Sequence, residues 1–169
     1  RAIGDFMKAA DQDQLYYDAY MQLGELFALR DDPLAEGYFI NALRISPNNL
    51  EALYMLGMFY QNTEEYDKAL SMYDRLIIAE PSFRNAPYNK GYIFLVYLQD
   101  FPNAIEAFTQ AIRVDSTYVN AFFNRGYAYE LTNQPELARS DYQTTLILDV
   151  NNKKAIEGMN RLDRLKAKK

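Results

Sequence analysis

The stretch that decides the fold is LEALYMLGMFYQNTEEYDKALSMYDRLIIAEP, residues 50–81. Two small residues in this stretch, Gly57 and Ala69, belong to columns that recur along the chain at nearly constant spacing. The columns are Gly24, Gly57, Gly91 and Gly126, and Ala2, Ala35, Ala69, Ala104 and Ala138. The glycine spacings of 33, 34 and 35 residues indicate an array of repeated structural units.

Two further columns follow the alanines, one of aromatic residues after four positions and one of mostly small residues after three more. They are Phe6, Phe39, Tyr73, Phe108 and Tyr142, then Ala9, Ala42, Leu76, Ala111 and Thr145. Spacing of i, i+4, i+7 is one face of an α-helix. The glycines have their own aromatic column three residues later, which predicts a second helix in each unit. Its members are Phe27, Tyr60, Phe94 and Tyr129.

Turn-forming residues separate the predicted helices. They are DDP at 31–33, NTEE at 62–65, DFP at 100–102 and NQP at 133–135. The distance from Ala35, Ala69 and Ala104 to the next glycine is always 22 residues, whereas the distance from glycine to alanine varies from 11 to 13. Because loops accept insertions more readily than packed interfaces, we expect the length variation to lie in the turn inside each unit. The run IFLVYLQDF, residues 93–101, carries the insertion, and its apolar residues are expected to pack within a longer turn or to form an exposed docking patch.

Residues 50–81 resemble the tetratricopeptide repeat (TPR). The residues at motif positions are Leu53, Leu56, Gly57, Tyr60, Ala69, Tyr73, Leu76 and Pro81. The resemblance covers the chain as four full repeats at 17–49, 50–83, 84–118 and 119–152, a half repeat at 2–16, and a capping helix at 153–169. It implies an all-α fold, a right-handed superhelical solenoid of antiparallel helix pairs that forms a single domain over 1–169. Lys90 and Arg125 depart from the pattern by standing where leucine is usual.

The composition argues against an enzyme. The chain has no histidine and no cysteine, so it lacks the commonest general base, the commonest metal ligand and thiolate chemistry. The acid pairs Glu64-Glu65 and Asp31-Asp32 fall at predicted turns, where carboxylates at helix starts are stabilised by the helix dipole. We therefore expect a non-catalytic protein with no metal site and no cofactor.

Charge and hydropathy restrict the partners further. Residues 1–152 hold 11 Lys/Arg against 21 Asp/Glu, whereas residues 153–169 hold 7 against 2. The acidic body argues against nucleic acid, whose binding requires neutralised phosphates, and the basic tail is interpreted as a soluble last helix. The longest apolar run, at 92–98, is too short to cross a membrane, so no membrane insertion is expected. The compartment stays open between the cytoplasm and, had a signal been removed, the periplasm.

The resemblance implies that the first helix of each repeat lines a concave groove. The stripe outside the core is acidic and Met-rich in the first two repeats, with Asp18, Met21, Gln22, Glu25, Glu51, Tyr54, Met55 and Met58. In the last two repeats it consists of amide and aromatic side chains, which suit an extended peptide. The candidate peptide-binding residues are Asn85, Tyr88, Asn89, Tyr92, Asn120, Phe123, Asn124, Tyr127, Tyr54 and Met58.

The pentapeptides YNKGY (88–92) and FNRGY (123–127) place Asn89 and Asn124 at the position where some tetratricopeptide proteins use an Asn ladder to hold a ligand backbone. The alternative is that Asn85 and Asn120 cap their helices while the ladder residues are solvated or bond to neighbouring helices. The alternative to partner contact for the neighbouring aromatic residues is ordinary packing between helices. These residues are Tyr88, Tyr92, Phe123 and Tyr127. A chaperone-type clamp is not expected, because amides occupy its basic positions.

The sequence thus predicts a protein- or peptide-binding scaffold module. The alternative is a structural segment of a larger repeat scaffold or assembly subunit that associates through its ends. Ala2, Phe6 and Ala9 form the inner face of a helix without its partner helix, so self-association through that end, or a longer array, is also expected.

Overall fold

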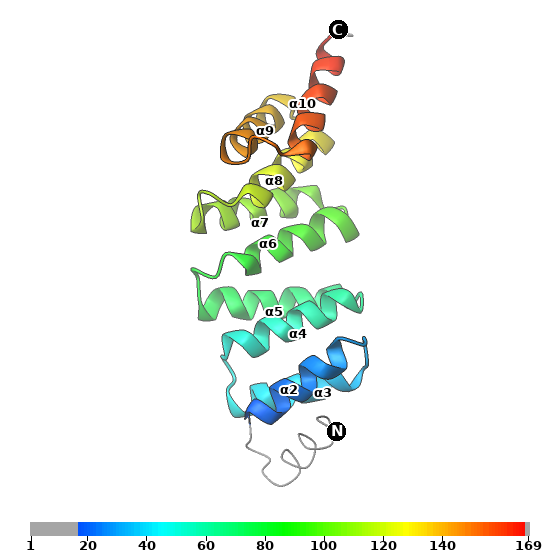
Figure 1. The fold of residues 1–169 in the computed structure, drawn as a ribbon, viewed down its shortest axis with the longest axis vertical. Helices are drawn as coiled ribbons and strands as arrows, with labels where there is room; N and C mark the ends of the chain where they lie inside the picture. Colours follow the sequence, from blue (N-terminus) through cyan, green and yellow to red (C-terminus); the bar gives the residue numbers. More distant parts are fainter. Residues whose placement is uncertain (1–16, 168–169) are drawn as a thin grey trace. The chain divides into compact units, whose positions relative to one another are not determined.

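The computed structural model describes residues 17–167, and within this range every regular element is a helix (Figure 1). The elements are α2 (Tyr17–Ala28), α3 (Leu34–Ile45), α4 (Leu50–Asn62), α5 (Tyr66–Ala79), α6 (Asn85–Tyr92), the π-helix η1 (Ile93–Tyr97), α7 (Phe101–Val114), α8 (Val119–Leu131), α9 (Pro135–Leu148) and α10 (Lys153–Lys166). The predicted half repeat at 2–16 lies outside the described residues. The all-α prediction is confirmed.

The helices fall into two compact units that divide between Pro81 and Ser82. The first unit contains the pairs α2–α3 and α4–α5, and the second contains α6–α7, α8–α9 and α10 (Figure 1). Each predicted repeat therefore corresponds to one helix pair, of which α2, α4, α6 and α8 are the first helices. That the units act as one domain over 1–169 remains a prediction.

Each pair is held together by the contact between its glycine and its aromatic column. A Cβ atom placed on Gly24 would lie 2.6 Å from the ring of Phe39, and one placed on Gly91 would lie 2.7 Å from the ring of Phe108. Both rings are fully buried. The helix backbones approach closely because the glycine has no side chain, so the two columns predicted from the sequence are the two sides of one interface.

The buried ring of the second helix alternates between phenylalanine and tyrosine from one pair to the next. The residue four positions after the glycine of the first helix changes with it. The Tyr73 hydroxyl donates to Gln61 Oε1 at 3.0 Å, and the Tyr142 hydroxyl donates to Glu130 Oε2 at 2.6 Å. Both acceptors lie four residues after the glycine of the first helix. Where the ring is phenylalanine, that position is apolar, as Ala28 and Leu95. The polar edge of each tyrosine ring thus has its own partner within its pair.

A residue in the left-handed region closes each turn inside a pair. These are Asp31, Glu64, Gln99 and Asn133, with φ of 51°, 64°, 52° and 55°. The N–H of the next residue donates back to an aromatic residue of the first helix, as from Glu65 to the Tyr60 carbonyl at 2.8 Å and from Gln134 to the Tyr129 carbonyl at 2.9 Å. Such a bond over five residues satisfies a carbonyl at the helix C-terminus. The aromatic column after each glycine therefore also supplies the acceptors that end the first helices.

The third pair contains the one-residue insertion, and the structure places it inside the first helix. The Asp100 N–H reaches the Phe94 carbonyl at 2.8 Å across six residues instead of five. Between them, Ile93–Tyr97 is π-helical, with the Leu98 N–H donating to the Ile93 carbonyl at 3.1 Å. A π turn holds one more residue than an α turn, so it absorbs the insertion. The prediction that length varies only in the turn is wrong for this pair.

The insertion also brings apolar side chains to the surface. Val96, Tyr97 and Leu98 have 44%, 44% and 43% of their surface exposed. The expectation of packing is therefore wrong for these three residues, which match the exposed patch, whereas Ile93 and Leu95 of the same run are buried.

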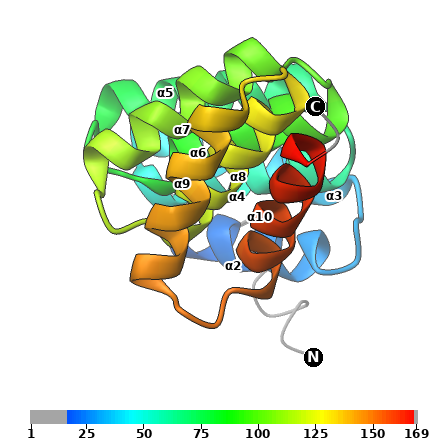
Figure 2. The same cartoon turned by 90° about the horizontal axis from the view of Figure 1, so that it is seen from above.

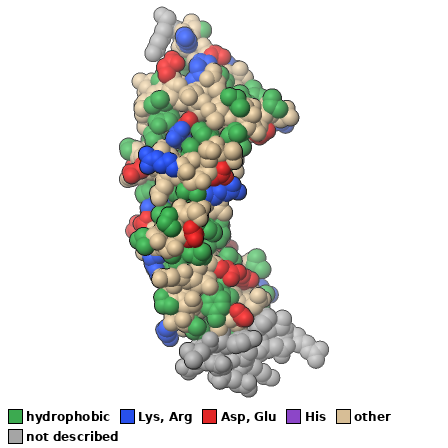
Figure 3. Space-filling view, turned by 90° about the vertical axis from the view of Figure 1, so that its left-hand side faces the viewer, with side chains coloured by type: hydrophobic (Ala, Val, Ile, Leu, Met, Phe, Trp, Pro, Cys, Tyr) green, Lys and Arg blue, Asp and Glu red, His purple; other side chains and the backbone are tan. Residues whose placement is uncertain are grey.

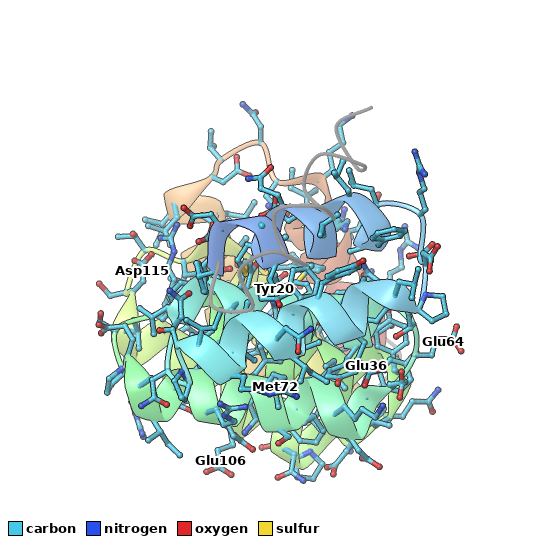
Figure 4. The ribbon with its side chains drawn as sticks, turned by 90° about the horizontal axis from the view of Figure 1, so that it is seen from below. Tyr20, Glu36, Glu64, Met72, Glu106 and Asp115 are labelled. Atoms are coloured by element: carbon cyan, nitrogen blue, oxygen red, sulfur yellow. The ribbon has the colours of Figure 1, made fainter. Side chains whose placement is uncertain are left out.

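Polar contacts join successive pairs within the first unit. Glu36 of α3 accepts from the Tyr60 hydroxyl at 2.7 Å and pairs with Lys68 Nζ at 3.1 Å. Figure 4 shows Glu36 toward the same side of this unit as Glu64, which lies in the turn after α4. The hydrogen bond from Tyr60, the largest cause, and the nearby Lys68 hold the pKa of Glu36 below its ordinary value of 4.5.

The helix α10 packs against α8 and α9 in the second unit (Figure 2). A Cβ atom on Gly158 would lie 2.5 Å from the Tyr142 ring, whose other edge already faces Gly126. Arg161 donates to both carboxylate oxygens of Glu130, at 2.7 and 2.9 Å. The predicted capping helix therefore also docks through a glycine, but onto the ring of the helix that precedes it. Gly158 lies 20 residues after Ala138, so it falls outside the 22-residue spacing of the glycine column.

Candidate functional site

The ten candidate residues lie on first helices, but in both units. Tyr54 and Met58 belong to α4 of the first unit, and the other eight belong to α6 and α8 of the second. We call those eight residues the amide-aromatic surface. They are Asn85, Tyr88, Asn89, Tyr92, Asn120, Phe123, Asn124 and Tyr127.

Side-chain contacts link α6 to the following repeat across the amide-aromatic surface. The Asn124 amide N–H donates to the Tyr88 hydroxyl at 3.1 Å, and the Tyr118 hydroxyl donates to Asn85 Oδ1 at 3.1 Å. The rings of Tyr88 and Tyr118 lie 4.9 Å apart between centroids. Burial, the largest cause, raises the pKa of the Tyr88 hydroxyl above its ordinary value of 10, so the phenol stays protonated at neutral pH. These contacts give the surface a fixed geometry.

Exposure divides the surface into anchors and accessible groups. Asn89 and Asn124 are each only 9% exposed, so most of each residue is covered by its neighbours. Asn120 and Tyr127 are exposed, and the remaining members are half-buried. An Asn amide has two N–H donors and an oxygen, and the bond to Tyr88 uses one donor of Asn124. An accessible ring beside a fixed amide is suited to hold an extended backbone.

The capping alternative for Asn85 and Asn120 is wrong. The N-cap positions of α6 and α8 are held by Arg84 and Tyr118, and neither helix start shows a side-chain cap hydrogen bond. Asn85 instead accepts the hydrogen bond from Tyr118. The alternative that a ladder residue bonds to a neighbouring helix describes Asn124.

An ion pair under α8 fixes its position. Arg125 donates from Nε and Nη2 to the two carboxylate oxygens of Asp141, each at 2.8 Å, and from Nη1 to Thr109 Oγ1 at 3.0 Å. These bonds connect α8 to α7 and α9 at Arg125, the residue that follows Asn124 in the sequence. The sequence pattern identified Arg125 only as a departure from leucine and did not identify Asp141 as its partner. The pair can be seen by comparing repeats, because the positions of Arg125 and Asp141 are held in the second repeat by two apolar residues, Leu56 and Met72.

Tyr54 and Met58 line a separate groove of about 520 Å³ between α2 and α4. The lining residues are Glu25, Ala28, Leu29, Asp31, Tyr54, Met55, Met58, Phe59 and Asn62. The sequence stripe named Glu25 and Met55 as neighbours but ended before Leu29 and Asn62, which lie four residues after Glu25 and Met58 on the same helical spacing. Asp31 lies in the turn after α2, where that spacing does not apply. Leu29 is 84% exposed, so this groove has an apolar margin.

A second hollow, of about 350 Å³, lies beside Tyr127. It is lined by Leu95, Val96, Gln99, Phe101, Tyr127 and Leu131. The π-helix therefore borders one member of the amide-aromatic surface with the apolar residues that the insertion exposes.

The residues from 17 to 167 contain no group of three or more acidic side chains placed to hold a metal ion. Within the same range, the helices are too short or too polar to cross a membrane. On the face drawn in Figure 3, basic and acidic side chains alternate with apolar and neutral ones, and neither charge forms a continuous field.

Family models match two segments of the chain. One is described as "TPR repeat" and matches residues 95–133, and the other is described as "Tetratricopeptide repeat" and matches residues 38–71. The chain is also similar to anaphase-promoting complex subunit 3 of Schizosaccharomyces pombe, with 32% identity over 97 residues. That match covers 56% of this chain and 14% of the relative, so the chain spans only a small part of the relative's length.

Solved structures are similar over most of the chain. The MamA protein matches with a TM-score of 0.81 and 21% identity, covering 89% of this chain and 82% of that chain, a likeness of fold alone. The first TPR of Spaghetti (RPAP3), solved bound to the HSP90 peptide SRMEEVD, matches with a TM-score of 0.66 and 25% identity. It covers 70% of this chain and 93% of that chain.

Proposed function

Because this chain is a tetratricopeptide repeat protein, we propose that it is a non-catalytic binding module that holds peptide segments of partner proteins on its first helices. The family match supports the scaffold role in general, and a similar structure is that of a protein bound to a peptide. The groove-binding role rests on the arrangement of side chains on α6 and α8.

The observation that carries the proposal is the hydrogen bond between Asn124 and Tyr88. It fixes an amide of one repeat against a ring of the preceding repeat, while Tyr127 remains 37% exposed one turn further along α8. A peptide backbone exposes alternating N–H and C=O groups, and an Asn amide bonds to either. Preorganised amides and rings lower the entropy that the protein loses on binding.

We propose that the protein is not an enzyme because of the types of side chain that it contains and the contacts that they make. With no histidine or cysteine in the chain, the candidate acid-base groups are carboxylates, lysines and tyrosines, and none of them is the usual base near neutral pH. Asp31 and Glu64 lie in turns that close helix pairs, and Glu130 is bonded to Tyr142 and Arg161. These roles are structural.

The test is selection of peptides from a random phage-displayed library on the wild-type protein, followed by titration of variants with a selected peptide. Tyr127→Ala with Asn120→Ala removes exposed groups and is expected to weaken binding about tenfold or more. Because the Tyr127 ring also lies 5.9 Å from the Arg161 guanidinium, a small decrease in melting temperature is expected beside the loss of binding. Glu106→Gln changes an exposed residue of α7 and is the matched control. Equal affinity of the surface variant and the control would contradict the proposal.

The ladder residues need a different comparison. Asn89→Ala with Asn124→Ala is expected to weaken binding, but it also removes the bond to Tyr88 and so costs about 1 kcal/mol of stability. Tyr88→Phe removes the same bond and keeps both amides. Binding that survives Tyr88→Phe but not the double alanine variant would assign the affinity to the amides.

A second candidate function is that of a structural segment in a larger assembly. The observation in its favour is the similarity to a subunit of the anaphase-promoting complex, of which the chain spans 14%. Association through residues 2–16, including self-association, belongs to this proposal. Truncation to residues 17–169 tests it, because loss of partner capture or of oligomers with peptide binding intact would favour the structural role.

A further inference from the structure

We propose that the groove between α2 and α4 binds a cationic peptide segment of a partner protein, with an aliphatic side chain in the groove and flanking Lys or Arg at its acidic margin. This inference rests on the proposed binding function and names the class of partner for the first unit. The amide-aromatic surface of the second unit carries no such charge preference, so the two surfaces are predicted to recognise different peptide chemistry.

The floor of the groove is apolar and adaptable. Tyr54, Met55 and Met58 of α4 face Ala28 and Leu29 at the end of α2 across a volume of about 520 Å³. This volume is enough for one or two aliphatic side chains of a peptide. Methionine side chains are unbranched and polarizable, so they adjust to the shape of an inserted side chain.

The margin of the groove is acidic. Glu25 and Asp31 line it, and neither α2 nor α4 contains a Lys or Arg residue. Arg30 follows α2 but is exposed and is not a lining residue. A cationic side chain in the groove would therefore lie near carboxylates that no Lys or Arg of α2 or α4 neutralises.

Further carboxylates lie near the start of the same helices. Burial, the largest cause, and the nearby carboxylates of Glu51, Asp18 and Glu25 together raise the pKa of the Tyr17 hydroxyl to about 12. These three acids come from α2 and α4 and act on one phenol. The negative potential thus extends along both first helices of the unit.

Helix ends add to the negative potential. Ala28 is the last residue of α2 and Asn62 is the last residue of α4, and both line the groove. A helix C-terminus carries partial negative charge, which Lys or Arg in the last turn usually balances. The last turns of α2 and α4 have no basic residue. Two uncompensated helix ends at one groove favour a cationic ligand.

The chain's own N-terminal residues are poorly matched to this groove in charge. Residues 1–16 contain two basic and three acidic residues. Residues 153–169 are basic, with seven Lys/Arg against two Asp/Glu, so a second copy of the chain is the occupant that the test must separate from a partner peptide.

The experiment uses the full chain and two fluorescein-labelled octapeptides with a central Leu-Leu, one flanked by lysines and the other by glutamates. Fluorescence polarization is expected to show binding of the lysine peptide and none of the glutamate peptide. Glu25→Gln with Asp31→Asn is expected to weaken the lysine peptide about tenfold. Asn at position 31 keeps the left-handed conformation accessible.

Glu64→Gln with Asp67→Asn is the matched control, because it removes two exposed charges of the same unit that do not line the groove. Leu29→Ser with Met58→Ala tests the apolar part and is expected to weaken the lysine peptide severalfold. Equal losses in the groove and control charge variants, with no effect of Leu29→Ser and Met58→Ala, would reduce the binding to attraction by the acidic body and overturn the inference.

Two further outcomes separate the alternatives. If the lysine peptide does not bind while library-selected peptides still bind through Tyr127, the inference fails and the proposed function stands; if neither binds, both fail. Sedimentation analysis that shows a dimer, lost both on deletion of 153–169 and in the Glu25→Gln, Asp31→Asn variant, would assign the groove to a second copy and overturn the proposal.

Discussion

The guanidinium of Arg125 forms two hydrogen bonds of 2.8 Å with the carboxylate of Asp141, and their side chains are 16% and 6% exposed. A fork of this kind holds α8 at a fixed rotation against α9. That rotation directs Asn124, the residue before Arg125, toward Tyr88.

Removing one partner of this pair is expected to be more harmful than replacing both. Asp141→Ala should cost about 3–5 kcal/mol of unfolding free energy, because it leaves the Arg125 charge largely buried. Arg125→Leu with Asp141→Met copies Leu56 and Met72 of the second repeat and should lie much closer to the wild type. Urea unfolding of the two single variants and the double variant measures this. A double variant as unstable as the sum of its singles would contradict the expectation.

Glycine to alanine substitution should have opposite effects at two helical positions. At Gly91 the new Cβ atom meets the Phe108 ring at 2.7 Å, so Gly91→Ala is expected to destabilise by about 1–3 kcal/mol. At Gly37 no neighbouring atom lies within 4 Å, and Gly37→Ala is expected to stabilise α3 by about 0.5–1 kcal/mol. Thermal unfolding of both variants provides the comparison. Similar changes at the two sites would show that the ring contact does not limit the packing.

Deleting one residue from the π-helix should be tolerated. Removal of Val96 restores the five-residue bond from Asp100 to Phe94 and regular helix geometry, so the unfolding free energy is expected to stay within about 1 kcal/mol of the wild type. Deletion of Glu106 from α7 is the control. It rotates Phe108 and Ala111 away from the buried face and should cost about 3–5 kcal/mol. Equal losses in the two deletions would disprove the assignment of the insertion to η1.

The stabilisation from Glu130 should depend on pH. Burial raises the pKa of this carboxyl, but hydrogen bonds from Arg161 and Tyr142 outweigh it and hold the net pKa below its ordinary value of 4.5. A depressed folded-state pKa means that the ionised form stabilises the fold above pH 4.5 and that this contribution is lost as the pH falls through the lower folded value. Glu130→Gln should therefore be clearly less stable than the wild type at pH 7, and this difference in stability should be smaller at pH 3.

Urea unfolding at the two pH values measures the difference, and Glu106→Gln corrects for the loss of a general negative charge. A penalty for Glu130→Gln that stays constant from pH 7 to pH 3 would show that the charge of Glu130 is not what stabilises α10 against α8.

The fold could be predicted because the main contact of each helix pair, between a glycine and an aromatic ring, recurs as two columns of residues in the sequence. Glycine and ring must be complementary in every pair, so Gly91 and Phe108 reveal the interface without coordinates. The position of the insertion could not be predicted, because the apolar run at 93–98 has no residue that marks a π turn. Whether the extra residue lies in the turn or in the end of the helix is decided there by backbone hydrogen bonds, which the sequence does not show.

The site was predictable as a stripe but not as a surface. Helical spacing identified Tyr88 and Asn124 as members, yet their mutual hydrogen bond depends on how two repeats stack. The groove of the first unit extends to Asp31 in the turn after α2, where helical periodicity gives no information about side-chain direction. The joint change to Arg125 and Asp141 was visible in the sequence and could have identified their contact.

The alternation between tyrosine and phenylalanine at the ring position has a consequence for folding fidelity. Similar repeats invite mispairing, in which a first helix docks onto the second helix of the wrong repeat. Tyr73 needs an acceptor such as Gln61, and a first helix carrying Leu95 would bury that hydroxyl without one. A helix exchanged between adjacent repeats would therefore lose a hydrogen bond, and the polar atoms that join each pair also distinguish it from its neighbours.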